Sequence, residues 1–321
     1  MLKAQAGPDR SDQDGPGQDG SAQDVEIDLG AWEITGESVR GYLQAVGDTL
    51  PIYFQRHLAP PLALSAWALG RILRHMDLPS GAIHSLQEME SLRAVGFGEM
   101  VSASVKISEP RRRGGLEFIT AAFAVRAHSP ETGRSQEVVN GKTTVLVPGN
   151  SEGGGQESSG RHQVEQGPQE AISGSEAGGA GGYSPVERAI EQSSLDAYAQ
   201  ASGDLNPLHL DPGFAATTRF GAIIAHGMLT LALISEDMAG AFGRDWLDSG
   251  ALKVRFKGAA YLGDRLATKR RITKEEPSAH GRRATSAVGV IDTATGRDLV
   301  SGTASVTLGP ENTAGAGDRT L

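Results

Sequence analysis

Two stretches of the chain repeat each other, and this repeat limits the folds that the chain can adopt. The segment YLQAVGDTLPIYF begins at Tyr42, and YAQASGDLNPLHL begins at Tyr198, 156 residues later. Tyr, Gln, Ala, Gly, Asp and Pro stand at the same places in both segments. A long apolar stretch follows each copy, and a TGR triplet with a β-rich run comes later in each. The chain is therefore expected to contain two copies of one fold.

The length of the chain suits two such copies. Its 321 residues can form two domains of common size. The segment 148–182 is rich in Gly, Ser, Gln and Glu with almost no apolar residues, so it is expected to be a flexible linker. The expected organisation is a disordered acidic tail, an N-terminal domain, this linker, a C-terminal domain and a second disordered tail, at 1–25, 26–147, 148–182, 183–308 and 309–321.

Composition excludes several classes of function. The formal net charge of -9 and the pI near 5.4 argue against a nucleic-acid partner, because phosphate binding needs a basic face. The absence of cysteine excludes disulfides, thiolate metal sites and a cysteine nucleophile. The sequence has neither a run of about 18 apolar residues nor an apolar leader. We therefore expect no membrane partner and a cytoplasmic location.

Hydrophobic patterning follows the same order in both copies. A short amphipathic helix ends at Gly-Asp, a loop follows, and then comes a helix that is apolar nearly all round and is therefore expected to be buried. Segments such as LKVRFK, RATSAVGVID and DLVSGTASVTL alternate apolar and polar residues, as antiparallel strands do. The expected class is α+β, with each copy an antiparallel sheet wrapped around a central helix.

A polar segment in the second copy, GDLNPLHLDPGFAATTRFGAIIAHGM, carries the residues best suited to chemistry. Gly203 permits a tight turn, and Pro207 fixes one backbone angle. Asp204 stands five residues before His209. A carboxylate and an imidazole held together make a general acid and base near neutral pH, and they could hold one water between them.

The motif YAQASGDLNPLHLDPGFA, followed by AHGML, resembles the signature of the MaoC-like hydratases, the R-specific enoyl-CoA hydratase family with the hot-dog fold. The Tyr42 copy extends the resemblance to a chain with two hot-dog domains packed as a pseudo-dimer. The resemblance implies a hydro-lyase of fatty acid metabolism. Such an enzyme adds water to a trans-2-enoyl thioester to give the R-3-hydroxyacyl thioester, or runs the reverse dehydration.

The resemblance also implies roles for single residues. Asp204 and His209 would activate the water. The backbone N–H of Gly227 would polarise the thioester carbonyl, because a helix N-terminus favours the developing enolate charge. Asn206 would fix the loop or the water, and Ser235, two helical turns beyond Gly227, would reach the acyl group.

The first copy departs from this pattern. Asp48 takes the place of the catalytic Asp, but Tyr53 stands where the His would be, and Leu50 replaces the Asn. A tyrosine with a pKa of about 10 is a poor base at neutral pH. We therefore expect the N-terminal domain to have lost catalysis and its groove to accommodate the acyl chain.

Basic residues of the second copy could meet the phosphates of the substrate. Lys253, Arg255 and Lys257 fall on one face of the expected strand LKVRFK. One interpretation is a solvated face. The other is that Lys253, Arg255 and Lys257, with Arg219, bind the phosphates of coenzyme A or of a carrier-protein arm. The segment EPRRRGG at 109–115 is expected to be an exposed hairpin turn.

Several alternatives stay open at this point. A metal site could form from two acids and two histidines, Asp204, His209, Asp211 and His226. By itself, His226 fits a loop or core histidine beside the glycine that follows it. We expect no metal and no cofactor, with the thioester of CoA or of an acyl carrier protein as substrate. We also expect a homodimer of double hot-dog chains. The rival functions are a non-catalytic acyl-binding or assembly module and a hot-dog thioesterase.

Overall fold

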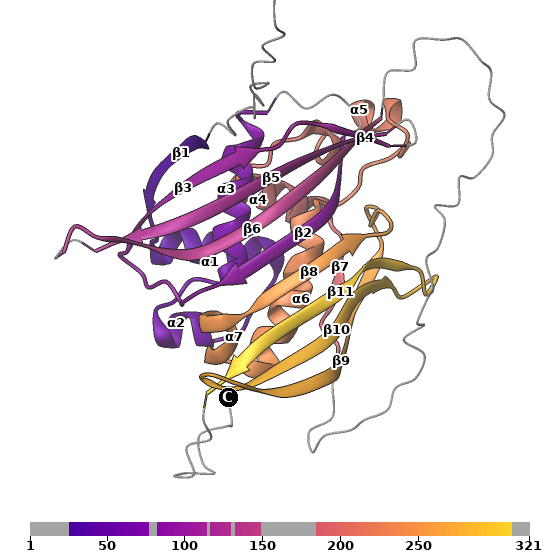
Figure 1. Ribbon diagram of the computed structural model, residues 1–321. Helices are drawn as coiled ribbons and strands as arrows, with labels where there is room; N and C mark the ends of the chain where they lie inside the picture. The colour runs from indigo at the N-terminus through magenta and orange to yellow at the C-terminus, as the bar shows by residue number, and fades with distance from the viewer. Residues whose placement is uncertain (1–25, 77–81, 114–115, 130–131, 149–183, 310–321) are drawn as a thin grey trace, which may run out of the picture.

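The computed structural model describes residues 26–76, 82–113, 116–129, 132–148 and 184–309 (Figure 1). We call residues 26–148 the N-terminal half and residues 184–309 the C-terminal half. The expected tails and linker lie almost wholly outside the described residues, so the domain boundaries remain predictions. Within the described ranges no helix is long and apolar enough to cross a membrane.

One antiparallel sheet of eleven strands runs through both halves (Figure 1). The N-terminal half contributes β1 (Glu26–Glu33), β2 (Ile83–Ser91), β3 (Met100–Ile107), β4 (Arg111–Arg113), β5 (Leu116–His128) and β6 (Ser135–Pro148). The C-terminal half contributes β7 (Glu187–Ala189), β8 (Ala251–Phe256), β9 (Arg265–Ser278), β10 (Gly281–Asp292) and β11 (Asp298–Leu308). The strand order is β1-β3-β5-β6-β2-β8-β11-β10-β9-β7, and β4 pairs with β5.

The two halves have matching strand orders. Counted outward from the centre, β2, β6, β5, β3 and β1 correspond to β8, β11, β10, β9 and β7. The halves join where β2 pairs with β8, from Leu86 opposite Arg255 to Glu90 opposite Ala251. The sequence repeat thus reflects a repeated fold, and the two expected sheets form one continuous sheet.

The helices of both halves lie behind the sheet in Figure 1. The N-terminal half has α1 (Gly36–Val46), α2 (Ile52–Arg56) and α3 (Pro61–Leu73). The C-terminal half has α4 (Gln192–Ser202), the 3-10 turn η1 (Pro207–His209), α5 (Pro212–Thr217), α6 (Gly227–Phe242) and α7 (Arg244–Ser249). Most residues of α3 and α6 are buried, which confirms the prediction made from their uniform hydrophobicity.

Both amphipathic helices end at a glycine, as the repeat predicts. Gly47 follows α1 with φ 73° and ψ 18°, and Gly203 follows α4 with φ 79° and ψ 13°. This left-handed conformation favours glycine, because a Cβ would be strained there. The next residues, Asp48 and Asp204, are presented alike. Each carboxylate accepts a hydrogen bond from the backbone N–H two residues later, at 2.9 Å and 3.3 Å respectively.

The basic segment of the N-terminal half differs from its expected structure. Arg111–Arg113 are exposed as expected, but they form strand β4 rather than only a turn, and β4 pairs with Leu116–Phe118 of β5. Charged side chains suit a short strand at the edge of a sheet, because they remain in water and discourage further pairing.

Candidate active site

A cavity of about 340 Å³ lies between the two halves. Its N-terminal-half wall comes from the end of α3 and from β2 and β6, with Leu69, Leu73, Ala82, Ile83, His84, Thr143 and Val145. Its C-terminal-half wall includes the 204–209 segment, the start of α6 and the end of β8. Six residues that the sequence analysis singled out line it: Asp204, Asn206, His209, Arg219, Gly227 and Lys257. Neither half alone encloses this space.

Two hydrogen bonds shape the segment that carries the acid and the base. The Asp204 carboxylate accepts from the Asn206 backbone N–H at 3.3 Å. The side-chain oxygen of Asn206 accepts from the Leu208 N–H at 3.0 Å, which caps the turn η1. Pro207 at the start of η1 adds a fixed backbone angle. The structure thus places Asn206 where it can fix this segment, one of the two roles expected for it.

The tautomer of His209 follows from its partner. Nδ1 of this buried ring lies 2.8 Å from the carbonyl oxygen of Ile224. Because a carbonyl can only accept, Nδ1 carries the proton and Nε2 presents a lone pair. Burial lowers the pKa of His209, against the opposing influence of the Asp204 charge. The neutral imidazole is therefore favoured, and its free nitrogen can accept a proton.

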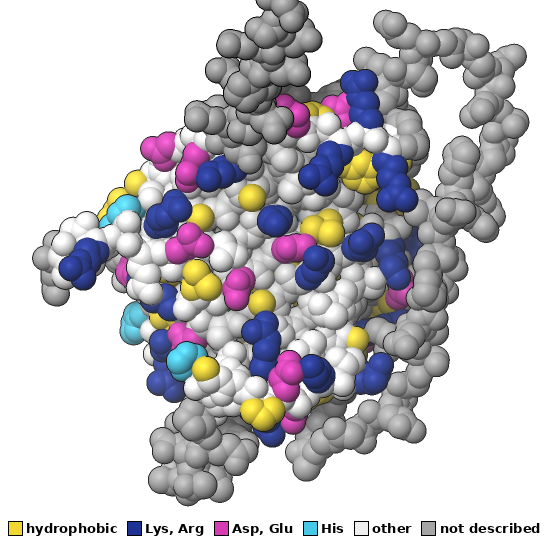
Figure 2. Space-filling view, in the orientation of Figure 1, with side chains coloured by type: hydrophobic (Ala, Val, Ile, Leu, Met, Phe, Trp, Pro, Cys, Tyr) yellow, Lys and Arg dark blue, Asp and Glu magenta, His cyan; other side chains and the backbone are white. Residues whose placement is uncertain are grey.

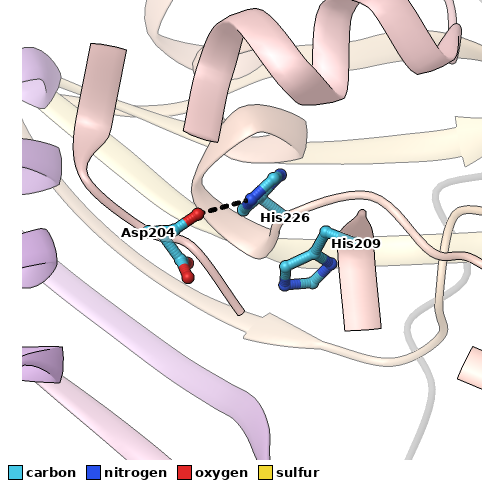
Figure 3. Close-up of side chains that lie close together, drawn as sticks. All are labelled: Asp204, His209 and His226. Carbon is cyan, nitrogen blue, oxygen red and sulfur yellow. Dashed lines mark hydrogen bonds between the residues drawn. The ribbon is translucent and has the colours of Figure 1, made fainter. Parts of the chain in front are cut away.

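Asp204, His209 and His226 come together beside the cavity (Figure 3). One carboxylate oxygen and one nitrogen from each ring all lie within 4.8 Å of one another. Figure 3 shows the Asp204 carboxylate and one nitrogen of the His209 ring turned toward the same space. A separation of this size suits a single water that bonds to both groups at about 2.8 Å. Burial raises the pKa of Asp204, and the charge of His209 opposes that rise.

His226 anchors this group from behind. It is fully buried, and its Nε2 lies 3.1 Å from the backbone carbonyl of Asp204, to which it donates. Its ring stacks on His209 with 3.9 Å between the centroids. Burial lowers the pKa of His226, so the neutral form is favoured. The histidine expected to shape the turn before α6 thus also ties that turn to Asp204.

The metal alternative loses one of its four expected ligands. Asp211 is exposed and caps α5, where it accepts from the N–H groups of Gly213 and Phe214 at 2.8 Å and 3.1 Å. The remaining three side chains, Asp204, His209 and His226, are close enough to share an ion. The absence of a cofactor stays a prediction.

Gly227 is the first residue of α6 and lines the cavity. The first N–H groups of a helix have no partner within it, so this end of α6 offers donors and the positive end of the helix dipole. A Cβ at this position would stand 3.0 Å from His84 Nδ1 and 3.3 Å from the Phe256 ring. The close approach of these two side chains explains why glycine fits here.

The structure does not bring three other expected residues to the cavity. Ser235 is buried on α6 and accepts a hydrogen bond from Trp246 Nε1 at 3.3 Å. Arg255 is exposed on β8, outside the cavity lining. Its neighbour Lys253 pairs with Glu88 at 2.7 Å, as a solvated face would allow. Ser235 faces the protein core, and Arg255 faces the outer side of the sheet, so spacing along the helix and the strand does not bring either residue to the cavity.

Two expected cations do lie at the cavity. Lys257 and Arg219 are exposed and line its edge. Arg219 also lies over the Phe220 ring, at 5.0 Å from the ring centroid. Only this part of the expected phosphate-binding set is in a position to meet a substrate that enters the cavity.

The equivalent place in the N-terminal half lacks the histidine and the N–H of the first helix residue. Tyr53, at the position of the histidine, is buried, and burial raises its pKa well above the ordinary value. Helix α3 begins at Pro61, which matches Gly227 when APPL is laid over AHGM. A proline has no backbone N–H, so this helix start cannot donate as α6 can.

The N-terminal half was expected to accommodate the acyl chain, but the residues that it contributes to this cavity were not identified from the sequence. His84 and Thr143 line the cavity from β2 and β6. His84 lies outside the repeated segments, Thr143 lies in the β-rich run at the end of the first copy, and both are distant in sequence from Asp204. The alternation of apolar and polar residues predicts which side of each strand faces inward. It does not predict which residues of the other half that side will face.

Comparisons with known proteins show which family and which relatives the chain is similar to. A family model described as "MaoC like domain" matches residues 179–294. The chain is 40% identical over 81 residues to an (R)-specific enoyl-CoA hydratase from Aeromonas caviae, which covers 24% of this chain and 58% of that protein. It is 33% identical over 129 residues to 3-hydroxyacyl-thioester dehydratase Z of Mycobacterium tuberculosis, which covers 39% of this chain and 74% of that protein. The chain thus spans little more than half of the first of these relatives.

A solved structure extends the likeness to both halves. A Mycobacterium tuberculosis protein described as having a double hot-dog fold matches with a TM-score of 0.57 and 13% identity. The match covers 88% of this chain and 94% of that one. The expected fold, two hot-dog units in one chain, is therefore confirmed.

Proposed function

Because the chain belongs to the MaoC-like dehydratase family, we propose that it is a hydro-lyase acting on acyl thioesters. It adds water to a trans-2-enoyl thioester to give the R-3-hydroxyacyl thioester, and it catalyses the reverse dehydration. The observation that carries this proposal is the space shared by Asp204 and His209 beside the start of α6. The R configuration rests on the likeness to a relative named for that specificity.

The proposed reaction uses the two protonation states that burial favours. Nε2 of neutral His209 takes a proton from the water as the oxygen forms a bond to C3. The electrons of the double bond move toward the thioester oxygen, where the Gly227 N–H stabilises the enolate. The Asp204 carboxyl then gives its proton to C2, and the proton on His209 passes to Asp204. Each proton removed from water is thus accounted for, and the acid and base return to their starting states.

The two halves divide the binding of the substrate. Leu69, Leu73 and Val145 make the N-terminal-half wall of the cavity largely apolar, which suits an acyl chain. Arg219 and Lys257 at the edge suit the phosphates of coenzyme A or of a carrier-protein arm. This division supports the expectation that the N-terminal half accommodates the acyl group.

A panel of thioesters tests this function. Enoyl thioesters of increasing chain length, on CoA and on carrier protein, are incubated with the purified chain, and absorbance of the conjugated double bond is followed. Loss of absorbance with formation of the R-3-hydroxyacyl product is expected, and the R-3-hydroxyacyl thioester should regain absorbance. Release of free thiol without hydration would instead identify a thioesterase. Binding without turnover of any thioester would identify an acyl-binding module.

A further inference from the structure

His84 brings a polar atom from the N-terminal half against the start of α6. Its Nδ1 lies 3.0 Å from the point where a Cβ on Gly227 would stand. Its ring packs on Phe256 with 4.5 Å between the centroids. His84 has no part in the proton transfers proposed above, yet it lies next to the group that would hold the thioester oxygen.

The neighbours of His84 fix which nitrogen carries its proton. Gln87 is fully buried, and its Nε2 donates to the Glu88 carbonyl at 2.8 Å, which turns its Oε1 the other way. That oxygen accepts from Thr143 Oγ1 at 2.6 Å and lies 3.0 Å from His84 Nε2. His84 Nε2 must therefore donate, and Nδ1 is left with a lone pair. Burial lowers the pKa of His84 to about 4, so the ring stays neutral near neutral pH.

A lone pair in a partly buried cavity calls for a donor on the ligand. The enoyl group, the thioester carbonyl and the sulfur offer none. The first donor along the thiol arm of CoA and of carrier proteins is an amide N–H, two carbons beyond the sulfur. In the substrate, this amide is only a few covalent bonds from the thioester. If the Gly227 N–H binds the thioester oxygen, the amide therefore lies near His84.

We propose that Nδ1 of His84 accepts a hydrogen bond from the first amide N–H of the substrate's thiol arm. His84 is thus a binding residue, supplied by the non-catalytic half, that selects thioesters of pantetheine-type arms over simple thioesters. This inference rests on the proposed function, because it assumes that the thioester lies against Gly227. Thr143 and Gln87 act as positioning residues that hold the tautomer.

The test compares two synthetic substrates that differ in one group. Both carry the enoyl chain that the wild type hydrates best. One is the N-acetylcysteamine thioester, and in the other a CH₂ replaces the amide N–H while the carbonyl is retained. The ratio of kcat/KM for the two is measured for wild type, His84→Phe and Gln87→Leu. The control is His128→Phe, because His128 is exposed at the end of β5, outside the cavity lining.

The expected result is a coupling between His84 and the amide. The wild type and His128→Phe should prefer the amide substrate about five-fold, the value of an ordinary neutral hydrogen bond. His84→Phe should lose this preference, because the phenyl ring has no lone pair to accept the amide N–H; the ratio of the two substrates, not the absolute rate, carries the test. Gln87→Leu, which keeps the ring but frees its tautomer, should reduce the preference.

Two failures can be told apart. An equal loss on both substrates, or an unchanged preference in His84→Phe, would overturn the role of His84 while hydration by the wild type stands. Calorimetric binding of the corresponding saturated thioesters measures the same preference without turnover. If no enoyl thioester is hydrated, the proposed function fails, and the binding ratio still decides whether His84 recognises the amide.

Discussion

At the scale of single residues, the two halves differ where chemistry would be decided. Asp48 and Asp204 stand in equivalent turns, but Tyr53 replaces the histidine and Pro61 replaces the glycine at the helix start. The backbone before these helix starts is nearly the same. Pro60 has φ -61° and ψ 133°, and His226 has φ -57° and ψ 136°. The start of α3 thus shows that a proline fits at this position of the helix. A proline in place of Gly227 would remove the N–H without changing the course of the backbone.

We predict that Gly227→Pro abolishes most of the activity while leaving the fold intact. Proline is well tolerated as the first residue of a helix, and the conformation of His226 suits a following proline. Loss of one oxyanion donor should lower kcat about 10²- to 10³-fold. The measurement is kcat for enoyl hydration, together with the thermal unfolding temperature, which should stay near that of the wild type.

Gly227→Ala is the matched control for added bulk. It retains the N–H but introduces a Cβ that would stand 3.0 Å from His84 Nδ1. The alanine variant accounts for the added Cβ, so a further loss in Gly227→Pro is expected from the missing N–H together with the two other ring carbons. Equal turnover in the two variants would exclude the Gly227 N–H from the reaction.

Sequence spacing predicted that some of these residues are neighbours at the site, but it did not do so for others. Asp204 and His209 were predictable because a glycine, a proline and short local hydrogen bonds fix the segment between them. Ser235 and Arg255 were misplaced because counting turns or alternation does not say what a face will pack against. His84 was missed because its neighbours at the site come from the other half of the chain.

At the scale of elements, α6 and β7 bring charged side chains close to Asp48 of the N-terminal half. Glu236 of α6 pairs with Arg188 of β7, and the Glu236 side chain is 12% exposed. Burial, and then the charge of Asp48, raise the pKa of Glu236 to about 7, against the attraction of Arg188. A carboxyl group that resists ionisation thus lies at the contact between the halves.

This contact predicts a pH-dependent stability. Because the folded pKa of Glu236 exceeds its ordinary value of 4.5, the folded protein holds the proton more tightly than the unfolded chain. The resulting stabilisation is fully present below pH 4.5 and is lost as the pH rises toward about 7. Relative to Glu236→Gln, the wild type should lose on the order of 3 kcal/mol of unfolding free energy across this window.

Denaturant unfolding of wild type and Glu236→Gln at pH 5 and pH 8 measures this difference. Subtracting the unfolding free energies of the two proteins at each pH removes most of the contribution of other titrating groups. A difference that stays constant between the two pH values would mean that Glu236 ionises normally in the folded protein.

Elements with one clear period were predictable from sequence. The alternation in LKVRFK predicted the buried and exposed faces of β8, and the apolar runs predicted the buried helices α3 and α6. The pairing of β2 with β8 was not predictable, because it depends on two strand edges that are far apart in the chain. The short strand β4 was read as a turn because its three arginines carry no alternation.

At the scale of the whole molecule, the sheet and the cavity beside Asp204 span both halves. Glu88 of β2 and Lys253 of β8 join the halves by an ion pair as well as by backbone pairing, and other charged side chains are scattered over this outer face (Figure 2). The cavity needs walls from both. The sequence showed the duplication. It did not show that the site depends on the place where the two halves join, the pairing of β2 with β8.

This continuity predicts that the two halves unfold together. Scanning calorimetry should give one transition, with calorimetric and van't Hoff enthalpies that agree. Loss of activity on heating should follow the same curve. Two resolved transitions would show that each half is stable alone and that the shared sheet couples them weakly.

The most direct test of the account is the turnover of the acid–base pair. Hydration of an enoyl thioester is followed in wild type, Asp204→Asn, His209→Ala and the double variant, with folding checked by circular dichroism. Each single change should lower kcat about 10²- to 10⁴-fold. The double variant should lose little more than the worse single one, because both groups act on one water. Folded single variants that turn over at nearly the wild-type rate would contradict the account.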